Sequence, residues 1–120
     1  MVAFTPRSAR KASPVLRYHE FGTLERYLED NGASVPCVMT TVTNNAGGGQ
    51  LVSFENIRGT AELARRFDKS FFIDGRRFAE NVWFIKQREP DQTDRTIPDI
   101  VRDCFAFADG MTMSAKKDTF

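Results

Sequence analysis

The chain has few of the residues from which disulfide frameworks and metal sites are built. Its 120 residues include two cysteines, Cys37 and Cys104, and one histidine, His19. Neither cysteine belongs to a CxxC pair or a Cys/His cluster, so we expect buried free thiols rather than a disulfide framework. A zinc site or a histidine-dependent triad needs partners for His19 that the chain does not supply. The sequence therefore predicts no metal site.

The chain also lacks a long apolar run and an excess of charge of one sign. No segment approaches the roughly 20 consecutive apolar residues that span a bilayer. The 17 Lys and Arg residues nearly balance the 16 Asp and Glu residues, for a formal net charge of +1. This balance leaves no electrostatic footprint for nucleic acid or an anionic membrane. We therefore expect a cytoplasmic protein that binds neither nucleic acid nor membrane.

What the chain does have is an ordinary globular composition, 41% hydrophobic and 28% charged. Residues 1–22 match no motif and are expected to form an irregular N-terminal arm. Beyond them, β-branched apolar runs alternate with segments whose apolar residues recur at helical spacing. The predicted strands are 35–43, 70–74 and 111–113. The predicted helices are 23–31, one from Ser53 through Ala64, about 76–87, and one that opens at Thr96 as its N-cap.

Alternating strands and helices predict the α/β class, with parallel strands joined by right-handed crossover helices. In such sheets ligands gather beyond the carboxyl ends of the strands. The three predicted strands lead into Asn44 and Asn45, into Asp74, and into the segment from Ser114 to Lys117. This edge of the sheet is therefore the candidate site.

Taken one at a time, these residues have ordinary explanations. An aspartate that ends a strand, such as Asp74, commonly caps the helix that follows. A lysine pair such as Lys116 and Lys117 is commonly solvated surface. The glycines 47–49 match neither the P-loop nor the dinucleotide fingerprint, and a plain flexible connection accounts for them equally well.

Three longer motifs are more specific when they are taken together. Residues 43–53 read TNNAGGGQLVS, residues 74–81 and 84–89 read DGRRFAEN and FIKQRE, and residues 108–118 read ADGMTMSAKKD. They resemble the motifs TNNxAGGQPVS, DxxRFAEN…FIKQRE and (A/G)DxxTMS(A/G)KKD of the tryptophanase and tyrosine phenol-lyase family. The order and spacing are the family's, although Leu51 stands where the family has proline. The resemblance covers about residues 24–120.

The resemblance implies a fold, a cofactor and a catalytic residue. Residues 23–120 would be part of the three-layer large domain of an aspartate-aminotransferase-like (fold type I) enzyme that uses pyridoxal phosphate. Lys117 would bond to the cofactor aldehyde and move the α-proton of the substrate. Asp74 would face the pyridine nitrogen, whose protonated form a carboxylate stabilises.

The resemblance also implies further cofactor contacts and partners. Asn45 and Arg77 would lie near the ring oxygen, Ser114 would donate to the phosphate, and Lys116 would add positive charge nearby. The family further implies a homotetramer and a monovalent cation, potassium, for which we identify no ligand in this chain. Its upstream phosphate loop, stacking aromatic and C-terminal domain have no counterpart in this sequence.

The implied activity is β-elimination from an aromatic amino acid, with tryptophan giving indole, pyruvate and ammonia. A tyrosine phenol-lyase-type enzyme and a truncated, non-catalytic remnant of such a lyase are the alternatives. An aldolase or aminotransferase of the same fold is a third, against which the FAEN block argues. For the chain alone, we expect poorly covered apolar surface at Phe71, Phe72 and Met113, because parallel sheets are normally covered on both faces.

Overall fold

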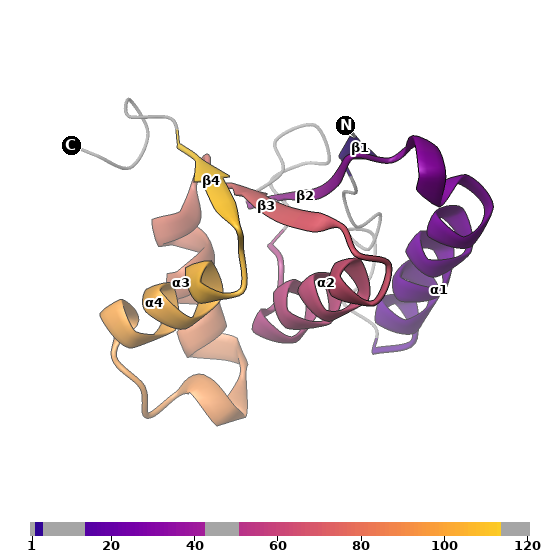
Figure 1. Ribbon diagram of the computed structural model, residues 1–120. Helices are drawn as coiled ribbons and strands as arrows, with labels where there is room; N and C mark the ends of the chain where they lie inside the picture. The colour runs from indigo at the N-terminus through magenta and orange to yellow at the C-terminus, as the bar shows by residue number, and fades with distance from the viewer. Residues whose placement is uncertain (1, 4–13, 43–50, 114–120) are drawn as a thin grey trace.

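The computed structural model describes residues 2–3, 14–42 and 51–113, with side chains described from residue 21 onward. In these residues a parallel sheet lies along one side and the helices lie along the other (Figure 1). The strands are β1 (Val2–Ala3), β2 (Cys37–Thr41), β3 (Ser70–Asp74) and β4 (Gly110–Thr112). The helices are α1 (Pro14–Asn31), α2 (Phe54–Arg66), α3 (Phe78–Arg88) and α4 (Ile97–Ala106), with 3-10 turns η2 (Gly32–Ser34) and η3 (Pro90–Gln92).

The sheet has four parallel strands in the order β1-β2-β3-β4, which confirms the α/β class with parallel strands and crossover helices. The strand predicted at 70–74 has the expected bounds. β2 is shorter than predicted, because Pro36 has no N–H to donate and the N–H of Val35 turns back to the carbonyl of Gly32 at 3.2 Å. β1 was not predicted.

The helices lie on one face of the sheet (Figure 1). A chain that advances one strand at each right-handed crossover places every crossover helix on the same face. The sheet and this helix layer are two of the three layers expected for the fold class. The opposite sheet face is not covered by any helix or strand among the described residues.

The core lies between the sheet and the helix layer. Val38 and Phe71 point into it and are 0% and 1% exposed, whereas the next residues, Met39 and Phe72, lie on the opposite face and are half-buried. The expectation that Phe71 is poorly covered is wrong, since α2 packs against β3. For Met113, which is 48% exposed, the same expectation of poor coverage is confirmed. The helices contribute Leu24, Leu28, Ile57, Ala61, Ala64, Val82, Ile85, Ile100 and Cys104 to the core.

α1 begins earlier than the sequence indicated. The helix runs from Pro14 to Asn31 instead of from Thr23, so the expectation of an irregular arm is wrong for residues 14–22. Proline is favoured in the first helical turn, because the N–H that it lacks has no helical partner there. Gly22 weakens the helix pattern without ending it. The division of the chain at residue 22 stays a prediction, and α1 runs across it.

The predicted helix starts at Ser53 and Thr96 are confirmed. The Ser53 hydroxyl accepts a hydrogen bond from the N–H of Asn56 at 3.0 Å. The Thr96 hydroxyl accepts one from the N–H of Asp99 at 3.3 Å, with Pro98 in the first turn of α4. Each cap satisfies an N–H that the helix itself leaves unpaired.

Candidate functional site

Asp74 ends β3 at the carboxyl edge of the sheet. Its Cα is in register with Thr41 of β2 on one side and with Thr112 of β4 on the other. Because Phe71 and Ile73 point into the core, alternation along the strand places Asp74 on the face away from the helices. Its carboxylate is therefore presented on the open sheet face.

The carboxylate of Asp74 does not cap the helix that follows. α3 starts at Phe78 with Arg77, not Asp74, as its N-cap residue, and the Arg77 side chain makes no cap hydrogen bond. The Oδ1 atom of Asp74 instead accepts a hydrogen bond from the hydroxyl of Thr112 at 3.2 Å. The helix-cap interpretation of Asp74 is therefore wrong, and the side chain points along the sheet surface toward β4.

The turn from Asp74 to Arg77 also holds the ends of both neighbouring strands. On the β2 side, the N–H of Val42 donates to the carbonyl of Asp74 at 2.9 Å, and the N–H of Arg77 donates to the carbonyl of Val42 at 3.1 Å. On the β4 side, the N–H of Gly75 donates to the carbonyl of Thr112 at 2.7 Å. One four-residue turn thus joins the carboxyl ends of three strands.

Arg77 is the second predicted site residue that the structure describes. Its side chain is 37% exposed, and its ion pair with Glu80 is long, with 3.9 Å between nitrogen and oxygen. Exposed pairs of this kind contribute little free energy. This weak pair leaves the side chain of Arg77 partly exposed at the end of the turn.

The other predicted site residues, Asn45, Ser114, Lys116 and Lys117, lie outside the described residues. The chain places them close in sequence to the turn's partners. Asn45 lies three positions after Val42, and Ser114 lies two positions after Thr112. The turn from Asp74 to Arg77 makes hydrogen bonds with Val42 and with Thr112.

Asn81 is a residue whose role the sequence analysis missed. Its side chain is 1% exposed, and its amide binds the backbone of one residue, Val52, on both sides. The N–H of Val52 donates to Oδ1 at 2.8 Å, and Nδ2 donates to the carbonyl of Val52 at 2.8 Å. Two residues farther on, the N–H of Phe54 donates to Oε1 of Glu89 at 2.9 Å. The FAEN and FIKQRE motifs contained both side chains, but the sequence did not show what they bind.

Asp109 is a second motif residue with a structural role. Its carboxylate accepts from the N–H of Phe71 at 2.7 Å, and its own N–H donates to the carbonyl of Phe71 at 2.7 Å. A Cβ on the neighbouring Gly110 would lie 2.5 Å from the ring of Phe72, which explains the glycine. These contacts set the register in which β4 reaches Thr112.

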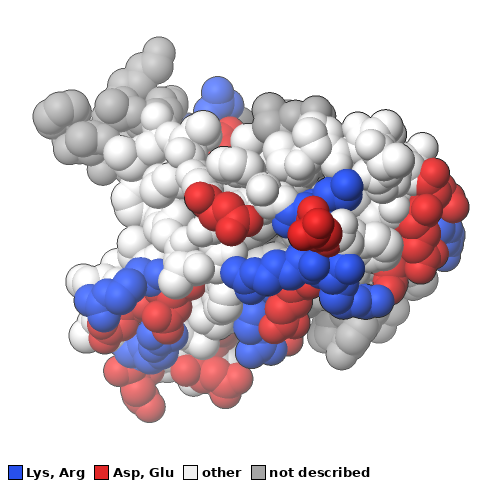
Figure 2. Space-filling view, viewed as in Figure 1, with Lys and Arg blue, Asp and Glu red and all other residues white. Residues whose placement is uncertain are grey.

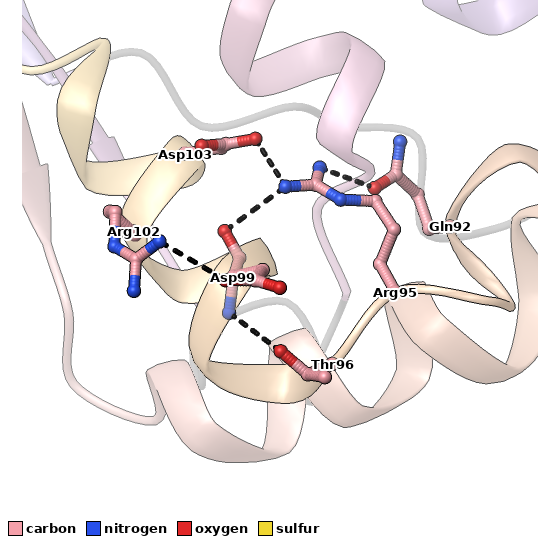
Figure 3. Close-up of polar contacts among 6 residues, drawn as sticks. All are labelled: Gln92, Arg95, Thr96, Asp99, Arg102 and Asp103. Carbon is pink, nitrogen blue, oxygen red and sulfur yellow. Dashed lines mark hydrogen bonds and ion pairs between the residues drawn. The ribbon is translucent and has the colours of Figure 1, made fainter.

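The segment between α3 and α4 is organised around Arg95, at the edge of the helix layer. Its guanidinium donates to Oε1 of Gln92 at 3.0 Å, to the carbonyl of Asp99 at 3.3 Å and to the carboxylate of Asp103 (Figure 3). Arg102 pairs with the carboxylate of Asp99 at 3.1 Å. These contacts hold the segment between α3 and α4 against α4, the helix that leads into β4.

Cys104 lies in the core, near the contacts of Arg95. Burial, and then the negative charges of Glu89 and Asp103, raise the pKa of its thiol to about 12. A thiol in this state is neutral and a poor nucleophile. It therefore has a packing role. The expectation of buried thiols is confirmed for Cys104, whereas Cys37 is half-buried.

The described surface carries both signs of charge. Figure 2 shows Lys and Arg interspersed with Asp and Glu over the helix layer. The ion pairs of the described residues include Arg58 with Glu55 and Arg66 with Glu25. Among the described residues, no group of three or more His, Cys, Asp or Glu is placed to hold a metal ion. No helix in the described ranges is long and apolar enough to cross a membrane.

These features define a parallel α/β layer whose strand ends present a carboxylate and a guanidinium from one turn. The beta-eliminating lyase family model matches residues 8–120, and the chain belongs to this family. The match includes most of the segment in which the sequence analysis found no resemblance.

Comparison with curated relatives agrees with this assignment. The chain is 67% identical over 101 residues to a tryptophanase of Rhodobacter capsulatus and 63% identical over 101 residues to one of Hyphomonas neptunium; both matches cover 84% of this chain and 22% of the relative. It is 50% identical over 95 residues to a probable beta-eliminating lyase of Trichomonas vaginalis, a match that covers 79% of this chain and 21% of the relative. The chain therefore spans about a fifth of the length of these relatives.

Proposed function

We propose that the protein carrying this chain is a pyridoxal-phosphate-dependent lyase that removes the side chain of an aromatic amino acid by β-elimination. The observation that carries the proposal is the turn from Asp74 to Arg77, which holds two charged side chains at the carboxyl edge and binds both neighbouring strand ends. The relatives named tryptophanase make tryptophan the first substrate to test, with indole, pyruvate and ammonia as products.

The described residues at this edge fit the cofactor. Pyridoxal phosphate needs an acid that faces its pyridine nitrogen and donors near its ring oxygen and phosphate. Asp74 supplies the carboxylate on the open sheet face, and Arg77 supplies a guanidinium that its weak pair with Glu80 leaves available. Both belong to one turn, so a ring that contacts the first is within the neighbourhood of the second.

When bound, pyridoxal phosphate supplies the electron sink for the electron pair that the departing α-proton leaves behind. Asp74 would keep the proton on the pyridine nitrogen, because a neighbouring carboxylate favours the charged form. Arg77 would donate to the ring oxygen. The sheet beneath Asp74 would exclude water from one side of its carboxylate, which strengthens the interaction.

The remaining roles fall on residues beyond the described ranges. Lys117 would bond to the cofactor and move the proton between the α-carbon and the leaving group. Asn45 would join Arg77 at the ring oxygen. Ser114 would donate to the phosphate, and Lys116 would add positive charge beside it.

The family also implies an environment for the protein. We infer a homotetramer that works in tryptophan catabolism in the cytoplasm, with potassium as an activating cation. The ligands for potassium would come from outside this chain.

A chimera tests the function directly. Residues 23–120 replace the matching segment of the Rhodobacter capsulatus tryptophanase, and indole and pyruvate release are measured with tryptophan and phenol release with tyrosine. We expect equal amounts of indole and pyruvate from tryptophan. Phenol release instead would assign the tyrosine phenol-lyase activity, and a folded, cofactor-loaded chimera with no turnover would indicate a non-catalytic remnant.

Reduction of the same chimera with borohydride tests the cofactor lysine. The reduced adduct is stable, so peptide mapping locates it. We expect the pyridoxyl group on Lys117. An adduct on Lys116 would overturn that assignment while leaving the activity assay to decide the function.

A further inference from the structure

Asn81 makes two hydrogen bonds of a kind that packing alone does not require. A buried amide needs partners for its oxygen and its nitrogen, because an unpaired buried polar group costs free energy. Here both partners belong to the backbone of Val52, 29 residues earlier in the chain, at 2.8 Å each. The side chain thus binds Val52 as a neighbouring strand would, and Val52 is itself 3% exposed.

The contacts around Val52 make this a fixed point of the backbone. Ser53 caps α2, and the N–H of Phe54 donates to Glu89 at the far end of α3. Asn81, within α3, therefore binds the residue two positions before α2. Glu89, directly after α3, binds Phe54, the first residue of α2.

The other end of the same connection is bound by the same stretch of chain. Val42, at the end of β2, exchanges hydrogen bonds with Asp74 and Arg77, and Arg77 leads directly into α3. The stretch from Asp74 to Asn81 thus fixes both places that flank residues 43–50, Val42 at one side and Val52 at the other. The two proposed cofactor contacts, Asp74 and Arg77, lie on that stretch.

From this arrangement we propose that Asn81 is a positioning residue of the cofactor site. It touches neither substrate nor cofactor. By holding Val52 it ties the start of α2 to α3, the helix that follows directly from the turn with Asp74 and Arg77, and so helps to orient that turn. This role rests on the proposed function, but the clamp on Val52 does not.

Hydrogen exchange in the full chain tests the clamp. Asn81→Ala removes both hydrogen bonds, and Leu28→Ala, in the core of α1, is the control that lowers stability while leaving the two hydrogen bonds between Asn81 and Val52 in place. Exchange of the Val52 amide should accelerate about tenfold or more beyond the global change in Asn81→Ala and follow the global change in Leu28→Ala. Equal acceleration at every amide in both variants would overturn the clamp.

The holo chimera described above tests the positioning role. Asn81→Ala should shift the pH midpoint of the cofactor's visible absorption, because the groups at the ring oxygen move, and should lower kcat more than it raises KM. Leu28→Ala should leave the midpoint unchanged. An unchanged midpoint in Asn81→Ala overturns the positioning role alone. A parent chimera that binds no cofactor overturns the proposed function, and this role with it, while the exchange result on the clamp stands.

Discussion

The hydroxyl of Thr112 donates a hydrogen bond to Oδ1 of Asp74 across the β3–β4 pair at 3.2 Å. The carboxylate has a second oxygen, and the bond to Thr112 sets the direction in which that oxygen points. Thr112 and Asp74 are in register, so backbone pairing already brings the two side chains together. β4 therefore contributes to the orientation of Asp74 as well as to the segment that follows.

Removing that hydroxyl should reduce turnover without abolishing it. Thr112→Val keeps the shape of the side chain, so we expect kcat of the chimera to fall by about threefold to tenfold, under about 1.4 kcal/mol of barrier. Thr112→Ser keeps the donor and should retain most of the rate. Steady-state kinetics of both variants measure the difference, and a Thr112→Ser variant that loses as much rate as Thr112→Val would show that keeping the hydrogen-bond donor is not enough to keep the rate.

Replacing Asp74 should have a much larger effect on turnover than on cofactor retention. In Asp74→Ala and in the nearly isosteric Asp74→Asn, the pyridine nitrogen loses the charge that keeps it protonated, whereas the phosphate contacts persist. Each tenfold loss of rate corresponds to about 1.4 kcal/mol, and we expect several such losses. Turnover and the cofactor dissociation constant are measured together. Near-normal turnover would refute the role of Asp74.

The two cysteines should differ in reactivity and in their effect on stability at high pH. Burial raises the pKa of the Cys104 thiol from 9.0 to about 12, so the folded state keeps a proton that the unfolded state releases in this range. Its contribution to stability is complete below pH 9 and is lost as the pH rises toward 12, by at most about 1.4 kcal/mol per pH unit.

Alkylation and unfolding experiments check both statements. At pH 8, iodoacetamide should label the half-buried Cys37 and spare Cys104 in the folded chain. Cys104→Val should reduce the loss of the free energy of unfolding between pH 9 and 12, with Cys37→Val as the matched control. Rapid labelling of Cys104 under native conditions would contradict the burial on which the prediction depends.

The elements that the sequence predicted best are those with local signals. The helix starts at Ser53 and Thr96 follow from side chains that cap their own backbone, and the strand at 70–74 follows from a short apolar run. The start of α1 was missed because proline and glycine usually count against a helix. Here Pro14 begins α1 and Gly22 lies within it, and neither residue ends the helix.

The candidate site divides in the same way. The sequence placed Asp74 at the carboxyl end of a strand, because the short apolar run that it ends is a local pattern. It did not show the bond from Thr112 to Asp74, or the binding of Val52 by Asn81, because each joins residues about 30 to 40 positions apart. Which long-range partner a polar side chain finds depends on packing, which a single sequence does not display.

The 120-residue chain alone should not be a competent lyase. Its sheet is covered by helices on one face, while Met39 and Phe72 lie half-buried on the other and Met111 and Met113 are 43% and 48% exposed. Asp74 is presented on that same open face, where water competes for its carboxylate. The relatives are about four times as long, so most of the surface that surrounds their site comes from other segments.

Preorganisation supplies much of an enzyme's rate, and a misplacement of about 1 Å can cost roughly a hundredfold. We therefore expect the purified chain, given pyridoxal phosphate and tryptophan, to release indole no faster than free cofactor does. Nonspecific reaction of the cofactor with accessible lysines is the background, and Lys117→Ala is the control for it. Indole release above the free-cofactor rate that Lys117→Ala abolishes would show that the isolated chain already assembles a working site.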